Sequence, residues 1–204
     1  RKPVQAFIKR LFDVLVCSLG IIIISPALLI LAILIKLDSK GPIIFKQKRI
    51  GLNAKEFYMY KFRSMHVSNN NNEELFFEQY LDDNQSLFKL KDDPRVTKIG
   101  KFIRKYSLDE FPQLINVIKG EMSLVGPRPK LPEELPHFAK RNFSLFAATP
   151  GITGLWQTCG RSSVRDFDRV AAMDYHYYKK WNLLLDLYLL FKTIPAVISG
   201  DNAY

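Results

Sequence analysis

The chain has 204 residues, 48% of them hydrophobic and 25% charged, which suits one globular domain with a core and a short anchor. Thirty Lys and Arg residues against twenty Asp and Glu residues leave a net charge of +10, which indicates an anionic partner: nucleic acid, a phospholipid surface or a phosphorylated substrate. Cys17 and Cys159 are far apart and lack metal-ligand spacing, which argues against a disulfide or zinc site and favours a reducing compartment.

An apolar run covers residues 14–35 and has basic residues before and after it. It is long enough to cross the hydrocarbon core of a membrane, so a spanning helix is the default prediction. A re-entrant hairpin is the alternative, because Ser25 and Pro26 interrupt the middle of the run and the basic flanks place both ends on the cytoplasmic side. Composition alone leaves the two alternatives about equal.

Residues 43–63 are rich in Ile, Phe and Tyr and predict two strands around a turn at 51–55. Lys61 and Arg63 alternate with aromatic residues at the end of the second strand. They either belong to a solvated basic face or line an active site, and the residues themselves do not decide between these roles. The Asn-rich and acidic segment 67–85 is predicted to be a surface loop that leads into a polar helix.

Two adjacent carboxylates, Asp109 and Glu110, stand where a helix should begin, and Gly120 is a plausible stop for it. A start at Ser107 would make Glu110 part of a structural capping box. A start at Asp109 would place Pro112 in the first turn, where its missing N–H costs nothing. Either start puts both carboxylates near the positive end of the helix dipole.

The helix that follows has apolar residues at helical spacing, which predict one buried face. These residues are Leu108, Phe111, Leu114, Ile115 and Ile118.

Beyond this helix, Arg128 lies between Pro127 and Pro129, whose rings fix the backbone, and its guanidinium can bind phosphate oxygens as a bidentate fork.

Residues 149–154 are predicted to form a turn-rich loop that brings backbone N–H groups to a phosphate. Residues 181–198 mix leucines and aromatics with charges, which favours a helix lying at a membrane interface. His66, His137 and His176 are isolated, so structural or surface places are expected for them.

Five motifs together resemble the bacterial sugar transferases, which are monotopic polyprenyl-phosphate phosphoglycosyl transferases. They are Lys-Phe-Arg-Ser-Met at 61–65, Asp-Pro-Arg-Val-Thr at 93–97, Ser-Leu-Asp-Glu-Phe-Pro-Gln-Leu at 107–114, Asn-Val-Ile-Lys-Gly-Glu-Met-Ser-Leu-Val-Gly-Pro-Arg-Pro at 116–129, and Pro-Gly-Ile-Thr-Gly-Leu-Trp-Gln at 150–157. The last motif and the ending Gly-Asp-Asn-Ala-Tyr are most similar to undecaprenyl-phosphate galactose or glucose phosphotransferases.

The resemblance implies transfer of hexose 1-phosphate from UDP-galactose or UDP-glucose to undecaprenyl phosphate, with release of UMP, as the first step of surface polysaccharide synthesis. By the same match Asp109 is the nucleophile that forms a covalent sugar-phosphate, and Glu110 is the Mg²⁺ ligand. The residues expected around the substrate phosphates are Lys61, Arg63, Arg104, Arg128 and Arg161.

The expected fold is α+β and helix-rich. A re-entrant membrane hairpin broken at Ser25 and Pro26 covers residues 1–37, and a catalytic domain with a small β-hairpin and interfacial amphipathic helices covers 38–204. The resemblance places this domain on the cytoplasmic face of the bacterial inner membrane, with the lipid bilayer and no nucleic acid as a partner. The sequence leaves a homo-oligomer open. Because the chain begins at Arg1, we expect that a preceding segment has been removed.

Two other functions fit parts of the sequence. A non-enzymatic, membrane-anchored basic module would explain the charge and the anchor but not the Asp109–Glu110 pair. A Mg²⁺-dependent lipid phosphatase would use the same residues and release free phosphate.

Overall fold

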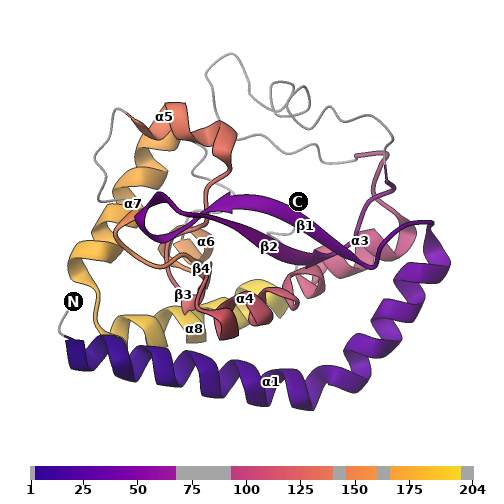
Figure 1. Cartoon of the computed structure of the whole chain (residues 1–204), viewed down its shortest axis with the longest axis horizontal. Helices are drawn as coiled ribbons and strands as arrows, with labels where there is room; N and C mark the ends of the chain where they lie inside the picture. The colour runs from indigo at the N-terminus through magenta and orange to yellow at the C-terminus, as the bar shows by residue number, and fades with distance from the viewer. Residues whose placement is uncertain (1–2, 68–92, 140–145, 160–165, 199–204) are drawn as a thin grey trace.

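The computed structural model describes residues 3–67, 93–139, 146–159 and 166–198. Within these ranges the protein is helix-rich α+β, as the sequence predicts, and it contains two small two-stranded sheets. A long N-terminal helix runs along one side of the molecule, and the β-hairpin and the shorter helices all lie on the other side of it (Figure 1).

The long helix α1 extends from Pro3 to Asp38 as one bent helix, so the helix does not break at Ser25 and Pro26 as predicted (Figure 1). The re-entrant course of the predicted membrane hairpin stays a prediction. Pro26 has no N–H to donate to the carbonyl of Ile22, and Ser25 Oγ donates to that carbonyl at 2.9 Å in its place. The carbonyl therefore keeps a partner and the helix continues. Among the described residues, α1 is the one helix long and apolar enough to cross a membrane, and 11% of its most apolar stretch is buried.

The predicted hairpin at 43–63 is confirmed. Strand β1 (Ile44–Ile50) pairs antiparallel with β2 (Glu56–Phe62), and the short 3₁₀ turn η1 (Leu52–Ala54) joins them. Asn53 lies at φ 55°, a left-handed conformation that asparagine tolerates. The strand β2 carries Lys61 at its end.

The segment with the two carboxylates differs from both predicted helix starts. Helix α3 (Lys98–Lys105) is followed by the 3₁₀ turn η2 (Leu108–Glu110), and α4 (Gln113–Lys119) begins only after Pro112. The capping-box alternative is not formed, because Ser107 has left-handed backbone geometry and its side chain makes no cap hydrogen bond to η2. The predicted stop is right, since Gly120 ends α4 at φ 86°.

The predicted apolar face of α4 is only partly correct. The residues of α4 that face the interior are Gln113, Asn116 and Val117, whereas Ile115 is 45% exposed. Asn116 is buried because it pairs with the backbone of β2: its Nδ2 donates to Tyr58 O at 2.7 Å and its Oδ1 accepts from Tyr60 N at 3.0 Å. This amide therefore fixes α4 against the strand that carries Lys61.

The rest of the chain forms a second small sheet and a set of short helices. Strand β3 (Ser123–Val125) pairs in parallel with β4 (Gly151–Thr153), which corrects the predicted loop at 149–154. Their neighbours are the 3₁₀ turn η3 (Pro132–Glu134), α5 (Leu135–Ala139), α6 (Leu155–Cys159), α7 (Phe167–Lys180) and α8 (Leu183–Ile198). Helix α8 covers the segment predicted to be helical, and its exposed side chains include Leu184 and Phe191.

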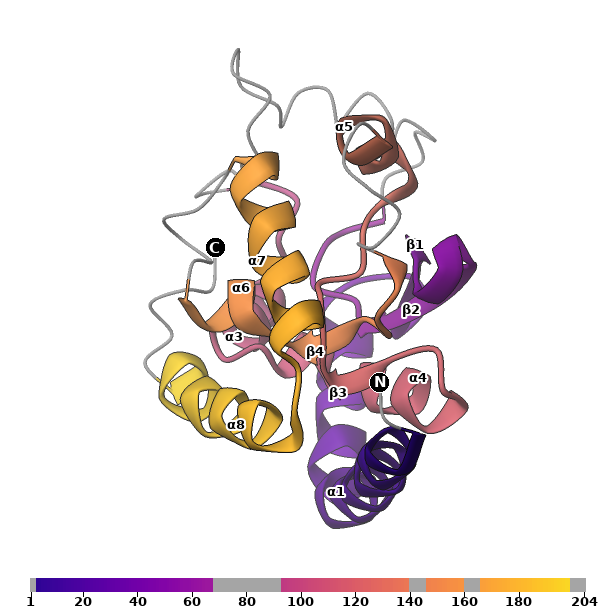
Figure 2. The same ribbon diagram turned by 90° about the vertical axis from the view of Figure 1, so that its left-hand side faces the viewer.

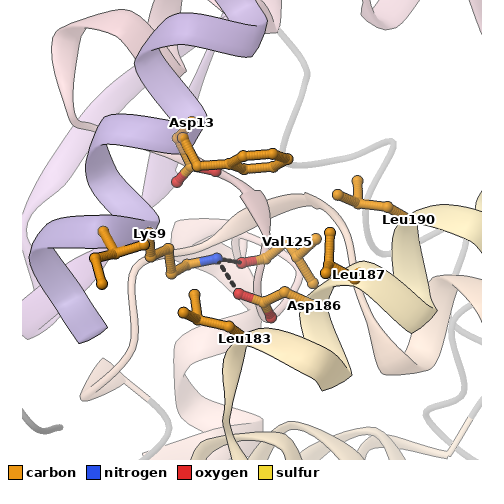
Figure 3. Close-up of a pocket in the computed structure, with 9 residues that line it drawn as sticks. Lys9, Asp13, Val125, Leu183, Asp186, Leu187 and Leu190 are labelled. Atoms are coloured by element: carbon orange, nitrogen blue, oxygen red, sulfur yellow. Dashed lines mark hydrogen bonds and ion pairs between the residues drawn. The ribbon is translucent and has the colours of Figure 1, made fainter.

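Both halves of α1 pack against the rest of the protein. Cys17 joins an apolar cluster with Val117 of α4, and Ile35 joins another with Ile103 of α3. Figure 2 shows α4 and α8 on the two sides of the N-terminal half of α1. There the buried Lys9 donates to Asp186 at 2.6 Å and to the carbonyl of Val125 at 3.0 Å, so one ion pair ties α1 to α8 and β3 (Figure 3).

Candidate active site

Asp109 and Glu110 lie on the turn η2, which packs against the end of β2. Lys61 Nζ donates to Glu110 Oε1 at 3.2 Å, and the two side chains are 23% and 24% exposed. The structure therefore brings together three of the predicted site residues on an accessible surface. Because this ion pair is partly solvated, it contributes little to stability and its partners can separate at little cost.

The turn η2 is fixed by backbone hydrogen bonds on its N-terminal side. Ser107 N donates to Arg104 O at 3.1 Å, and Glu110 N donates to Ser107 O at 3.1 Å. Arg104 lies in the last turn of α3 and is half-buried, so its side chain begins one turn before the carboxylates. The role of Arg104 as a phosphate ligand stays a prediction.

Arg128 is held by contacts with groups that are distant from Asp109 in sequence. Its Nη1 donates to both carboxylate oxygens of Glu134, at 2.9 and 3.1 Å, and its guanidinium lies over the ring of Trp156 at 5.6 Å. The Arg128 side chain is 21% exposed, whereas that of Glu134 is fully buried. Glu134 and Trp156 thus restrain the Arg128 guanidinium on its buried side, and its exposed part remains accessible to a ligand.

The Gly-Pro-Arg-Pro segment is seated against the Pro-Gly-Ile-Thr-Gly segment, two motifs that the sequence shows far apart. Gly126 N donates to Thr153 O at 2.9 Å, and Gly151 N donates to Pro127 O at 2.8 Å. A Cβ atom on Gly126 would lie 2.3 Å from Thr149 O, so only glycine allows this approach. The close contact explains why both motifs contain glycine at these positions.

Arg49 contacts the segment that carries Arg128, although no sequence motif predicts it. Its Nη1 donates to Pro129 O at 3.2 Å and its Nη2 to Gln47 Oε1 at 2.7 Å. Burial, followed by the charge of Arg128, lowers the pKa of Arg49 to about 9, and the charges of Glu134 and Glu110 oppose this shift. Arg49 is therefore protonated at neutral pH and lies within electrostatic reach of both Arg128 and Glu110. In the sequence nothing separates it from the neighbouring basic residues of its strand.

The acidic groups behind Arg128 have opposite pKa shifts. Burial would raise the pKa of Glu134, but Arg128, Arg49 and Lys130 outweigh it and the pKa lies below its ordinary value. Burial raises the pKa of Asp174 in spite of its ion pair with Lys130, in which Nζ and Oδ2 are 2.7 Å apart. Glu134 is thus the carboxylate that stays ionised beside Arg128.

The structure places Arg63 apart from these contacts, at the C-terminal end of α1. It is 5% exposed, and its guanidinium donates to the carbonyls of Ile35, Ser39 and Pro42. The carbonyl of Ile35 belongs to the last turn of α1 and those of Ser39 and Pro42 to the segment that follows, so Arg63 caps the helix and holds the chain just after it. A phosphate contact would require Arg63 to leave them. Arg161 and the side chain of His137 lie outside the described residues.

No group of three or more His, Cys, Asp or Glu side chains gathers at a point in the described ranges. His176 is exposed on α7, as expected for a surface residue. A closed protein cage of such side chains is thus not formed by these parts of the chain.

The bacterial sugar transferase family model matches residues 4–200. The chain therefore belongs to the bacterial sugar transferase family. It is 47% identical to an uncharacterized sugar transferase of Haemophilus influenzae over 97% of the chain and 42% of that protein. It is 42% identical to the exopolysaccharide production protein ExoY of Sinorhizobium fredii, over the whole chain and 91% of that protein. It is 45% identical to the undecaprenyl-phosphate galactose phosphotransferase of Salmonella typhimurium, over the whole chain and 43% of that protein. The chain thus spans less than half the length of the first and third of these relatives.

Proposed function

We propose that this protein transfers hexose 1-phosphate from a UDP-sugar to undecaprenyl phosphate. The observation that carries the proposal is the partly exposed Asp109–Glu110 turn, which Lys61 contacts and whose Glu110 interacts electrostatically with the buried cation Arg49. A carboxylate attacks a doubly charged pyrophosphate only where cations offset the repulsion, and this turn has them. The Salmonella relative, named for transfer of galactose phosphate to the same lipid, supports this reaction class.

The reaction has two displacements at the sugar-linked phosphorus. In the first, an Asp109 carboxylate oxygen bonds to this phosphorus, the bond to the bridging oxygen breaks, and UMP leaves with that oxygen. In the second, a phosphate oxygen of undecaprenyl phosphate attacks the same phosphorus and displaces Asp109. The products are undecaprenyl-diphosphate hexose and the free carboxylate, so Asp109 is regenerated.

The remaining residues bind and orient the phosphates in this proposal. Arg128 offers a guanidinium fork that is already restrained, and Lys61 would move from Glu110 to a substrate oxygen. The proposed phosphate ligands are Lys61, Arg104, Arg128 and Arg161, together with Arg63 if it releases its helix-end carbonyls.

Mg²⁺ fits the donor set of the turn, because this ion is usually held by one or two carboxylates and completes its shell with substrate phosphates. Glu110, which is partly exposed and pairs with Lys61 at 3.2 Å, would hold it. The ion would neutralise charge on the pyrophosphate, which lowers the repulsion that Asp109 meets.

We further propose that α1 and α8 hold the protein at the cytoplasmic face of the inner membrane. The apolar side chains of α1 are mostly exposed, and α8 presents Leu184, Phe191 and Ile194 to its surroundings. Exposed apolar surface of this extent is stable in contact with lipid. Such a placement would let a soluble nucleotide sugar meet a lipid substrate at one site and begin surface polysaccharide synthesis.

The test is the intact mass of the detergent-solubilised chain after incubation with Mg²⁺ and UDP-galactose or UDP-glucose, without lipid. We expect a gain of one hexose phosphate, its loss on addition of undecaprenyl phosphate, and no gain in Asp109→Asn. Asp168→Asn, an exposed aspartate on α7, is the matched control and should form the adduct normally.

Two outcomes would contradict the proposal. Absence of an adduct and of UMP with folded protein, with or without lipid, would favour a non-enzymatic basic module. Release of free phosphate from undecaprenyl phosphate would favour a lipid phosphatase.

A further inference from the structure

The buried carboxylate of Glu134 is the strongest feature of the site that the proposed mechanism does not use. It is fully buried, and each of its contacts is with a nitrogen donor. Oε1 accepts from Arg128 at 2.9 Å, and Oε2 accepts from Arg128 at 3.1 Å and from Leu131 N at 2.7 Å. A carboxylate with this set of partners is strongly fixed in position.

A purely local role would be to cap the turn η3, through the bond to Leu131 N. Capping needs a single oxygen and no burial, and it is normally achieved at the surface. Glu134 instead places both oxygens on one nitrogen of Arg128. The cost of burying this charge is offset by the cations around it, of which Arg128 is the nearest contact.

The contact with Glu134 determines which part of Arg128 is available. In the described part of the chain, Nη1 is the guanidinium nitrogen of Arg128 with a recorded hydrogen-bond partner, so the edge formed by Nε and Nη2 is left for a ligand. Trp156 covers one face of the guanidinium, and Arg49 holds the carbonyl of Pro129 next to it. These three contacts leave the arginine little freedom to rotate, and a fixed planar fork is what bidentate phosphate binding requires.

We propose that Glu134 is a positioning residue that fixes the Arg128 guanidinium so that its outer edge binds the diphosphate of the nucleotide sugar. The inference rests on the proposed function, in which Arg128 binds phosphate. Glu134 itself does not contact the substrate, because its carboxylate is enclosed and negatively charged.

The test is a double-mutant cycle on UDP affinity, measured by calorimetry with the full detergent-solubilised chain and Mg²⁺. The variants are Glu134→Gln, Arg128→Ala and the two combined. We expect Glu134→Gln alone to weaken UDP binding by about tenfold, as losses of orienting groups commonly do. In the Arg128→Ala background the same change should alter the dissociation constant by less than about twofold, because the group that Glu134 orients is absent.

Asp174→Asn is the matched control, since Asp174 is also a buried carboxylate but bonds to Lys130 instead of Arg128. It should lower the melting temperature and leave UDP affinity within about twofold of the wild type. If Glu134→Gln does not fold, Glu134→Asp, which keeps the charge and retracts it by one methylene, replaces it in the cycle.

Three results would overturn the inference: wild-type affinity in Glu134→Gln, losses that multiply in the double variant, or no UDP binding by the wild type. The binding cycle needs no turnover. Coupling between Glu134 and Arg128 in protein that forms no sugar-phosphate adduct would therefore refute the transfer reaction while supporting the role of Glu134.

Discussion

The two ion pairs of the site differ in how deeply their charged groups are buried. Glu110 and Lys61 form a partly exposed pair, which contributes little to stability and can open. Glu134 and Arg128 form a pair with one fully buried partner, which is costly to break. The exposed pair is therefore suited to exchange with substrate, and the buried pair to holding an arginine still.

The buried charge of Glu134 should make stability depend on acidic pH. Its folded-state pKa lies below the ordinary value of 4.5, although burial opposes this, because Arg128, Arg49 and Lys130 favour the ionised form. A depressed folded pKa adds stability above the unfolded pKa, and this contribution is lost as pH falls through the folded value. We expect the melting temperature of the wild type to exceed that of Glu134→Gln above pH 4.5 and the two to converge in more acidic buffer. Thermal melts from pH 7 downwards check this, and a difference that stays constant would contradict it.

At the scale of elements, the helix after the carboxylates is fixed to the β-hairpin by an amide and not by its apolar spacing. Asn116 is fully buried and bonds to Tyr58 O, Tyr60 N and Glu121 Oε2. These bonds satisfy edge groups of β2 on the side where the strand would otherwise need another strand. These bonds therefore help to hold the turn η2, which precedes α4, close to Lys61 of β2.

Replacing Asn116 with alanine should destabilise the protein, because it leaves partly buried backbone groups of β2 without these partners and removes a fully buried amide. We expect a loss of about 2 kcal/mol, or a fall of about 4–8 °C in melting temperature. Ile115→Ala, one residue earlier on the exposed side of α4, is the control and should change the melting temperature much less. Equal falls in melting temperature for the two substitutions would show that the amide contacts of Asn116 do not contribute to stability.

At the scale of the whole molecule, both ends of α1 are held by the same body. Near the N-terminal end Lys9 bonds to Asp186 of α8. At the other end Asp38 accepts from Ile99 N of α3 at 3.1 Å. A straight spanning helix would place its ends on opposite sides of the bilayer, whereas α1 is bent (Figure 1) and both its ends contact the same folded unit. The predicted division at residues 37 and 38 stays a prediction, since α1 also contributes to two apolar clusters of the body.

We therefore expect both ends of α1 to lie on the cytoplasmic side of the membrane. In a cysteine-free background, Val4→Cys and Lys40→Cys should resist a membrane-impermeant maleimide in whole cells and react in inside-out vesicles. Val4 is 68% exposed and Lys40 is exposed too, so both sites are accessible to the reagent. Labelling of Val4→Cys from outside intact cells would indicate a spanning helix instead.

The sequence by itself determined the features that depend on neighbouring residues: the hairpin at 43–63, the stop at Gly120, the apolar run with its proline, and the paired carboxylates. Backbone preferences and hydrophobic periodicity act over a few residues, so they can be read from the chain. The tertiary structure decided which charges are buried and what they contact. Arg49 bonds to a carbonyl 80 residues away, Arg63 caps α1, and Asn116 is buried in place of Ile115. Desolvation and pairing of this kind depend on groups that only folding brings together. The contact of Glu134 with Arg128 and that of Arg49 with the neighbouring Pro129 carbonyl are examples.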